Sequence, residues 1–139
     1  MIPLESRLEN VETTYAAAAR VMNGRGFTLG GNWDYDHGCF DRPLDDRRQV
    51  WLRVPFRVTG GSLNGEAAEA NEHTRIRFET PFVLKHVYEE GIDEEGQAGP
   101  FRSLVDQFQD PADPDAAVAD DWIDLARRQL SELESALVS

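Results

Sequence analysis

The sequence predicts an α+β fold, with one antiparallel sheet of four to five strands and an amphipathic helix near each end of the chain. Apolar residues recur at steps of three and four near both ends, which is the period of a helix with one buried face. Between these ends, apolar and polar residues alternate along two long runs, as in strands with one buried face. We expect residues 1–139 to form one domain in which both helices cover the same face of the sheet.

The first helix is predicted over residues 7–23. Ser6 and Glu9 stand in the S-x-x-E relation of a capping box, in which each side chain bonds the backbone N–H of the other residue. The apolar stripe ends at Asn23-Gly24, a pair typical of a helix exit. The stripe itself consists of Leu8, Val11, Tyr15, Ala18, Ala19 and Met22.

The second helix is predicted to begin near residue 120, with Asp120 or Asp121 as its cap. Acidic residues in the first turn also interact favourably with the helix dipole. Its apolar stripe consists of Trp122, Ala126, Leu130, Leu133 and Leu137.

Shorter strand patterns come before the first long run. Phe27, Leu29 and Trp33 alternate ahead of a turn that we place at residues 36–38, and residues 40–44 form a short strand. The clearest strand covers residues 49–58. Its apolar face holds Val50, Leu52, Val54, Phe56 and Val58, and its other face holds Trp51, Arg53, Pro55 and Arg57.

The run over residues 74–88 is predicted to be one strand that bends near Pro81, because its alternation has the same parity on both sides of the proline. Its apolar face consists of Ile76, Phe78, Phe82, Leu84, His86 and Tyr88. The polar connection over residues 59–73 is long, so we expect it to be mobile. A second connection over residues 89–100 precedes two Asp-Pro pairs that exclude a continuous helix.

Composition excludes several classes of partner. The chain has 14 basic and 26 acidic residues, a net charge of −12. Such a charge opposes the approach of nucleic acid and of anionic membranes, so we expect neither as a partner. One cysteine, Cys39, and the lack of an apolar export segment at the N-terminus are typical of a cytoplasmic protein. We expect Cys39 to be a buried, inert thiol.

The first candidate site lies in residues 26–40, GFTLGGNWDYDHGCF. Asp34, Asp36 and His37 offer two carboxylates and an imidazole, which suit a divalent metal or acid–base chemistry. On an extended strand His37 points away from the two aspartates, so only a turn brings all three together. The alternative is that they simply form the hairpin bend. The sequence identifies neither a catalytic partner for these groups nor a cofactor.

The second candidate site depends on pairing between the two long strands. This pairing places the basic side chains on the face opposite the apolar rows, namely Arg53, Arg57, Arg75, Arg77 and Lys85. Such a face suits a small anionic ligand, with Trp51, Trp33 and Tyr35 as aromatic surfaces. The alternative is that these cations pair with acidic neighbours such as Glu79 on a solvated face.

Four segments carry a resemblance to a known family: MIPLESRLENVE, GFTLGGNWDYDHGCFD, LRVPF and DQFQDPADPDA. They resemble the YugN-like family of small bacterial proteins, most specifically at residues 33–38. The resemblance covers nearly the whole chain and implies one intact α+β domain. It carries over no catalytic residue. Residues 42–48, which are rich in arginine, and the Ala/Glu loop at residues 66–72 depart from the family pattern.

Three hypotheses of function follow. The first is a non-catalytic binding or accessory domain that holds a small ligand or a partner on the sheet face or on the hairpin from Trp33 to His37. The second is a metal-dependent or acid–base enzyme centred on Asp34, Asp36 and His37. The third is an oligomeric structural module, such as a homodimer, with the long strand near Pro81 at its interface.

Overall fold

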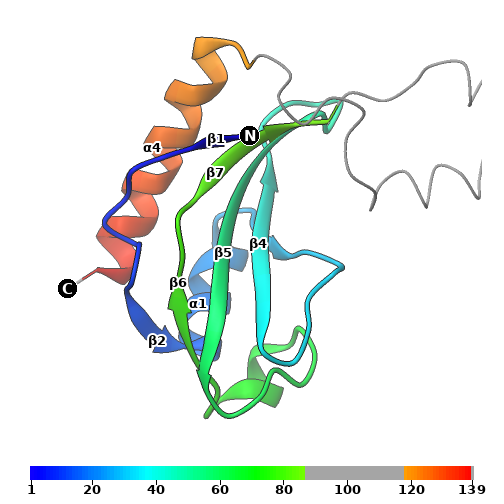
Figure 1. Ribbon diagram of the computed structural model, residues 1–139, viewed down its shortest axis with the longest axis vertical. Helices are drawn as coiled ribbons and strands as arrows, with labels where there is room; N and C mark the ends of the chain where they lie inside the picture. Colours follow the sequence, from blue (N-terminus) through cyan, green and yellow to red (C-terminus); the bar gives the residue numbers. More distant parts are fainter. Residues whose placement is uncertain (87–117, 139) are drawn as a thin grey trace, which may run out of the picture.

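The computed structural model describes residues 1–86 and 118–138, which form one open antiparallel sheet and two α-helices (Figure 1). The predicted α+β class is confirmed. The described strands are β1 (Ile2–Pro3), β2 (Glu12–Thr14), β3 (Thr28–Leu29), β4 (His37–Pro43), β5 (Val50–Gly60), β6 (Arg75–Phe78) and β7 (Phe82–Lys85). The helices are α1 (Tyr15–Gly24), α4 (Asp120–Leu137) and a short 3-10 helix, η1 (Ala68–Asn71). Tyr88, the connection at 89–100 and the Asp-Pro pairs lie outside the described residues.

The sheet has seven strands rather than four or five, since it includes β1, β2 and β3, which have two or three residues each. Strand β5 lies at its centre. It pairs with β4 on one side, and with β7 and then β6 on the other. The predicted alternation in β5 is confirmed, because Val50, Leu52, Val54 and Phe56 are buried and the residues between them are more exposed.

The prediction of one bent strand at 74–88 is wrong. Phe78 pairs with Phe56 of β5, and Phe82 pairs with Arg53 of β5. Three residues separate Phe78 from Phe82, whereas two separate Arg53 from Phe56, so the chain has one extra residue at this point. The alternation therefore reverses at Pro81, so that Val83 faces the core while Phe82 lies beside Arg53 on the opposite face. Pro81 has no N–H to donate to a ladder, which favours an irregularity at this position.

The first helix is shorter than predicted, because residues 7–14 form a turn and then β2, which pairs with β6. The capping box does not form: the Glu9 carboxylate accepts a hydrogen bond from the Thr80 hydroxyl, at 2.7 Å. Thr14 is the actual cap of α1, and its hydroxyl accepts a 3.2 Å bond from the Ala17 N–H. The β-branched residues Thr13 and Thr14 favour the extended backbone of β2.

Helix α4 begins near the predicted residue, although its cap is Ala119 rather than an aspartate and makes no side-chain capping bond. Its buried residues Ala126, Leu130 and Leu133 belong to one core cluster with residues of α1 and with the inward-facing residues of β4 to β7. Because this cluster uses one face of β5, both helices cover that face, as predicted. Neither described helix combines the length and apolar character that a membrane span requires.

The connection between β5 and β6 contains η1 and is held by hydrogen bonds, a local structure that the sequence did not predict. Asn71 is only 1% exposed. Its amide accepts a bond from the Asn64 N–H, at 2.8 Å, and donates to the carbonyls of Gly65 and Ala67, at 3.0 and 2.8 Å. The Tyr15 hydroxyl adds a 2.8 Å bond to the Glu66 carbonyl, which ties the connection to α1.

Candidate functional site

The sheet face opposite the helices carries a row of polar side chains across four strands. His37 of β4 lies opposite Arg57 of β5, Arg57 opposite Arg77 of β6, and Arg77 opposite Glu12 of β2. Cross-strand neighbours have Cβ atoms about 5 Å apart, so their functional groups can act on one ligand. Arg75 lies beside this row, opposite Gly60. We call His37, Arg57, Arg75 and Arg77 the basic row.

Two arginines of the basic row pair with carboxylates, as the alternative interpretation of the sequence anticipated. Arg57 lies 3.5 Å from Glu79, and Arg77 lies 3.2 Å from Glu12, with all four side chains exposed to a large extent. Exposed pairs of this kind contribute at most about 1 kcal/mol. Arg75 is exposed, and no ion pair between residues of the described ranges includes it.

Arg53 does not join the basic row, although it lies on the same face. Its guanidinium bonds the Asp41 carboxylate at 2.9 Å, and the two side chains are only 22% and 15% exposed. The guanidinium also lies 5.7 Å from the centre of the Phe82 ring. Burial acts to lower the pKa of Arg53, but neighbouring Cys39 and Asp41 outweigh it and raise that pKa. Arg53 therefore already has an anionic partner.

Cys39 is next to this ion pair and has the character of an inert thiol. Burial is the main cause that raises the pKa of Cys39, and the charge of Asp41 adds to it. The thiolate, which is the reactive form, is thus suppressed at neutral pH. Burial, followed by the charge of Arg53, also lowers the pKa of His86, so this histidine is neutral at neutral pH.

Trp51 and Lys85 lie at the end of β5 and β7 that is far from the basic row. The Trp51 indole N–H donates a 2.8 Å bond to the Arg48 carbonyl, and the Arg48 guanidinium lies 6.0 Å from the ring centre. Lys85 is opposite Val50, a core-facing residue, because the alternation reverses at Pro81. The expectation that Lys85 shares the arginine face is therefore wrong.

The turn before β4 brings Asp36 and His37 together. His37 Nδ1 lies 2.7 Å from Asp36 Oδ1. The Asp34 carboxylate instead accepts a 2.7 Å bond from the Tyr35 N–H, within its own turn. Among the described residues, no group of three or more His, Cys, Asp or Glu side chains is arranged to hold a metal ion. The turn begins at Asp34, which forms a β-bridge with His37, rather than at Asp36.

Trp33 and Tyr35 differ in exposure. Trp33 is partly buried against the core, whereas Tyr35 is 63% exposed. The backbone of this loop is fixed to β5 and the residues after it, since Val58 donates a 2.8 Å bond to the Asp36 carbonyl and Leu63 a 2.9 Å bond to the Tyr35 carbonyl. Tyr35 is thus held in solvent at the same end of the sheet as His37.

An open depression of about 460 Å³ adjoins this end of β5. It is lined by parts of the connection between β5 and β6, including Ser62, Asn71 and the acidic residues Glu69 and Glu72. Glu72 forms an ion pair with Arg20 of α1. The sequence did not indicate this depression, because the residues that line it lie in a loop that was expected to be mobile. Its acidic lining does not suit an anion.

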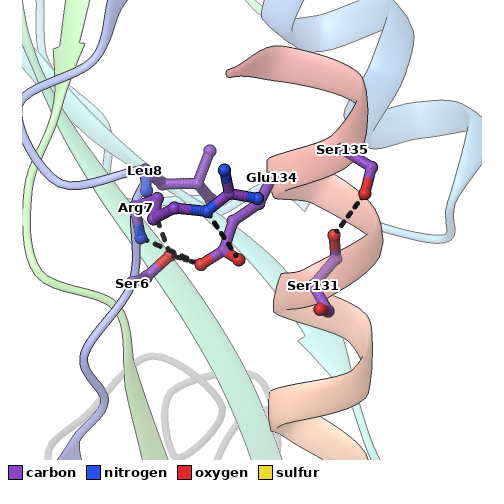
Figure 2. Close-up of polar contacts among 6 residues, drawn as sticks. All are labelled: Ser6, Arg7, Leu8, Ser131, Glu134 and Ser135. Atoms are coloured by element: carbon purple, nitrogen blue, oxygen red, sulfur yellow. Dashed lines mark hydrogen bonds and ion pairs between the residues drawn. The ribbon is translucent and has the colours of Figure 1, made fainter. Parts of the chain in front are cut away.

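Another polar site joins the N-terminal segment to α4 (Figure 2). The Glu134 carboxylate accepts a 2.7 Å bond from the Ser6 hydroxyl and a 2.9 Å bond from the Arg7 N–H, and lies 3.7 Å from Arg7 Nε. Burial acts to raise the pKa of Glu134, but the bonds from Ser6 and Arg7 and the charge of Arg7 lower it. The site is structural, and no local pattern in the sequence connects these residues.

The strand edge near Pro81, where we expected an interface with a second copy of the chain, is already paired with other strands. The Pro81 carbonyl accepts a 2.9 Å bond from the Leu4 N–H. Strand β1 pairs with β7 on one side of Pro81, and β2 pairs with β6 on the other. The edge that a second copy of the chain was expected to use is thus occupied by the N-terminal segment.

These features define a single-sheet α+β domain with a charged, exposed sheet face, and comparison with known proteins identifies its family. The model of the YugN-like family matches residues 3–137. "Uncharacterized protein YugN" of Bacillus subtilis (strain 168) is 34% identical over 139 residues, which cover 99% of each chain. The chain therefore belongs to the YugN-like family, as its sequence blocks indicated.

A solved structure has the same fold. The crystal structure of the uncharacterized conserved protein YugN from Geobacillus kaustophilus HTA426 has a TM-score of 0.70 to this chain at 19% identity. The similarity covers 99% of this chain and 95% of that one. At this level of identity the likeness concerns the fold alone.

Proposed function

We propose that this protein is a non-catalytic binding domain whose basic row holds a small anionic ligand. The observation that supports this proposal is the alignment of His37, Arg57 and Arg77 on neighbouring strands, with Arg75 beside them. In a chain with a net charge of −12, this exposed face gathers three guanidiniums. Guanidinium groups bind carboxylates and phosphates through paired hydrogen bonds.

The acidic neighbours of the basic row do not prevent such binding. Glu12 and Glu79 hold their arginines in exposed pairs, which a ligand with two or more negative charges can displace. The strongly negative remainder of the protein repels extended polyanions, so the ligand is small. Tyr35, at the same end of the sheet, offers an aromatic surface. Arg53 is outside the proposed site because Asp41 already neutralises it.

The proposal places the protein in the cytoplasm. Its one thiol, Cys39, stands on a strand and is shielded by burial. A reducing compartment suits a small domain that has no disulfide to stabilise it. No cofactor is part of the proposed function.

Thermal melts at low ionic strength with phosphate, citrate and tripolyphosphate test the proposal. We expect at least one of these anions to raise the melting temperature of the wild type, because a ligand that binds only the folded state stabilises it. The double variant Arg57→Ala/Arg77→Ala should lose this shift. Arg127→Ala/Arg128→Ala on the exposed surface of α4 makes the same change in net charge and should keep it. No shift with any anion, or equal losses in both variants, would contradict the proposed site.

A further inference from the structure

The contact between Asp36 and His37 determines which nitrogen of the imidazole is free. His37 Nδ1 lies 2.7 Å from Asp36 Oδ1, and a carboxylate can only accept a hydrogen bond. The neutral ring therefore carries its proton on Nδ1, and Nε2 has an unshared electron pair. No described residue forms a hydrogen bond with Nε2, and the His37 side chain is 52% exposed. Such a nitrogen is a nucleophile open to solvent.

The backbone around this pair is fixed. Asp34 and His37 form a β-bridge, in which the Asp34 N–H donates a 2.8 Å bond to the His37 carbonyl. The Asp36 carbonyl accepts a further 2.8 Å bond from the Val58 N–H. Asp36 and His37 are thus set at the start of β4 by bonds that do not involve their side chains.

The strands next to His37 supply positive charge. Arg57 lies directly opposite His37, and Arg77 lies opposite Arg57. A phosphoryl group on a side chain adds about 1.5 to 2 negative charges at neutral pH, and guanidiniums are the usual partners of such a group. Among the described residues, His37 is thus a nucleophile with a neighbouring cation that suits a phosphoryl product.

We propose that His37 Nε2 is a phosphoryl-acceptor site, modified by a donor of the phosphoramidate or acyl-phosphate class. The Nε2 electron pair forms a bond to phosphorus while the bond from phosphorus to the leaving nitrogen or oxygen breaks. The leaving group takes that electron pair and, where it is an amine, a proton from water. The ring is then a cation whose Nδ1–H is bonded to Asp36, and loss of this proton to water gives Nε2-phosphohistidine with an uncharged ring and a negatively charged phosphoryl group. His37 and Arg57 are shared with the proposed ligand site, so the inference rests on the proposed function to that extent.

The chain contains its own reference histidine. Of its three histidines, His73 is also exposed but lies in the connection between β5 and β6, next to Glu72. No ion pair or hydrogen bond between described residues holds the His73 ring, so both of its nitrogens are available. Comparison of His37 with His73 in one sample removes differences in protein concentration, donor concentration and pH.

The experiment incubates the purified chain with potassium phosphoramidate near neutral pH. ³¹P NMR follows the products, and mass spectrometry in alkaline buffer locates them. We expect His37 to be phosphorylated about tenfold faster than His73, and only on Nε2, because Asp36 orients the ring and Arg57 stabilises the product. Equal rates at the two histidines, or a product on Nδ1 of His37, would overturn the inference.

Two matched variants separate orientation from charge. Asp36→Ala should slow the modification of His37 to about the rate of His73 and give products on both ring nitrogens. Asp34→Ala makes the same change in charge two residues away, but among the described residues the Asp34 carboxylate bonds only the Tyr35 N–H, and its backbone bonds with His37 do not need the side chain, so the rate and the product should stay unchanged. Identical behaviour of the two variants would also contradict the inference.

The two proposals can fail separately. Asp36→Ala removes a negative charge beside the basic row, so it should not weaken the binding of tripolyphosphate. A wild-type chain that binds this anion but shows no preference for His37 in the phosphoramidate reaction retains the proposed function and loses the inference. If His37 is modified selectively but no anion shifts the melting temperature, the inference stands and the proposed function is lost.

Discussion

Glu134 accepts a hydrogen bond of 2.7 Å from Ser6, a residue 128 positions earlier in the chain. The same carboxylate accepts a bond from the Arg7 N–H, so one side chain of α4 holds two groups of the N-terminal segment. Figure 2 shows these contacts between the segment and the helix. The position of residues 6–8 therefore depends on a helix from the other end of the sequence.

Replacement of Glu134 by Ala should lower the free energy of unfolding by about 1–2 kcal/mol, because it leaves the part-buried Ser6 hydroxyl and the exposed Arg7 N–H without their acceptor. Urea denaturation monitored by circular dichroism measures this loss. Glu132→Ala, at an exposed position of the same helix, should change stability by about 0.5 kcal/mol or less. Equal effects of the two substitutions would show that the Glu134 contacts do not stabilise the fold.

The contribution of Glu134 should depend on pH. Its pKa is lower in the folded chain than in the unfolded chain, where a glutamate titrates near about 4.3. The stabilisation is therefore present above that value and disappears as the pH falls through the folded-state pKa. The difference in melting temperature between wild type and Glu134→Gln should be larger at neutral pH than below about pH 4. A difference that grows on acidification would contradict the lowered pKa.

Asn71 should be essential for the connection between β5 and β6. Asn71→Asp replaces the amide donor that faces the carbonyls of Gly65 and Ala67 with an acceptor, at a position that is almost fully buried. We expect a loss of about 2–3 kcal/mol. Asn64→Asp makes the same chemical change at an exposed side chain and should cost less than about 1 kcal/mol. Chemical denaturation of both variants compares them, and similar losses would argue against the role of Asn71.

Gly38 allows β4 to pass close to the core. A Cβ atom there would lie 2.7 Å from the Phe56 ring and 3.1 Å from Leu29. Gly38→Ala should therefore destabilise the protein by about 1–3 kcal/mol through overpacking. At Gly24, where no atom lies within 4 Å of the added Cβ, alanine should leave stability unchanged or raise it by up to about 1 kcal/mol. Thermal melts of the two variants should shift in different directions or by clearly different amounts.

Arg53 and Arg57 should differ in their effect on stability, although both are arginines on one face of β5. Arg53→Ala leaves the part-buried Asp41 carboxylate without its guanidinium and should cost about 2–4 kcal/mol. Arg57→Ala removes an exposed pair with Glu79 and should cost less than about 1 kcal/mol. A double-mutant cycle measures the coupling between Arg53 and Asp41. The double variant Arg53→Ala/Asp41→Ala should lose less stability than the two single variants lose in sum. Equal costs at Arg53 and Arg57 would be inconsistent with their different burial.

Local periodicity was sufficient to predict the central strand. In β5 the face of each residue follows from its neighbours in the same strand, so the buried positions from Val50 to Phe56 are predicted correctly. The same parity places Arg57, Arg75 and Arg77 on the exposed face. Strands β1 and β2 are too short to show a period, and they owe their pairing to β7 and β6, far along the chain.

The errors have long-range causes. The S-x-x-E pattern of Ser6 and Glu9 suits a helix cap, but these side chains bond Glu134 and Thr80 instead. The extra residue before Phe82 changes the parity of β7, and only the register against β5 reveals it. The candidate site was predicted only in part, again because of a long-range contact. The alternation in β5 places Arg53 on the expected face, but its ion pair with Asp41 depends on the pairing of β4 with β5, which the alternation does not reveal.

The position of the N-terminal segment affects the order in which parts of the chain fold during translation. Figure 1 shows β1 and β2 lying along β7 and β6, whose residues 75–85 come much later in the sequence. Ser6 reaches its partner later still, because Glu134 lies 128 positions after it in the sequence. Residues 1–14 leave the ribosome well before residues 75–85 and Glu134, so their docking partners are missing when they emerge. This segment is therefore among the later parts of the sheet to reach its native place.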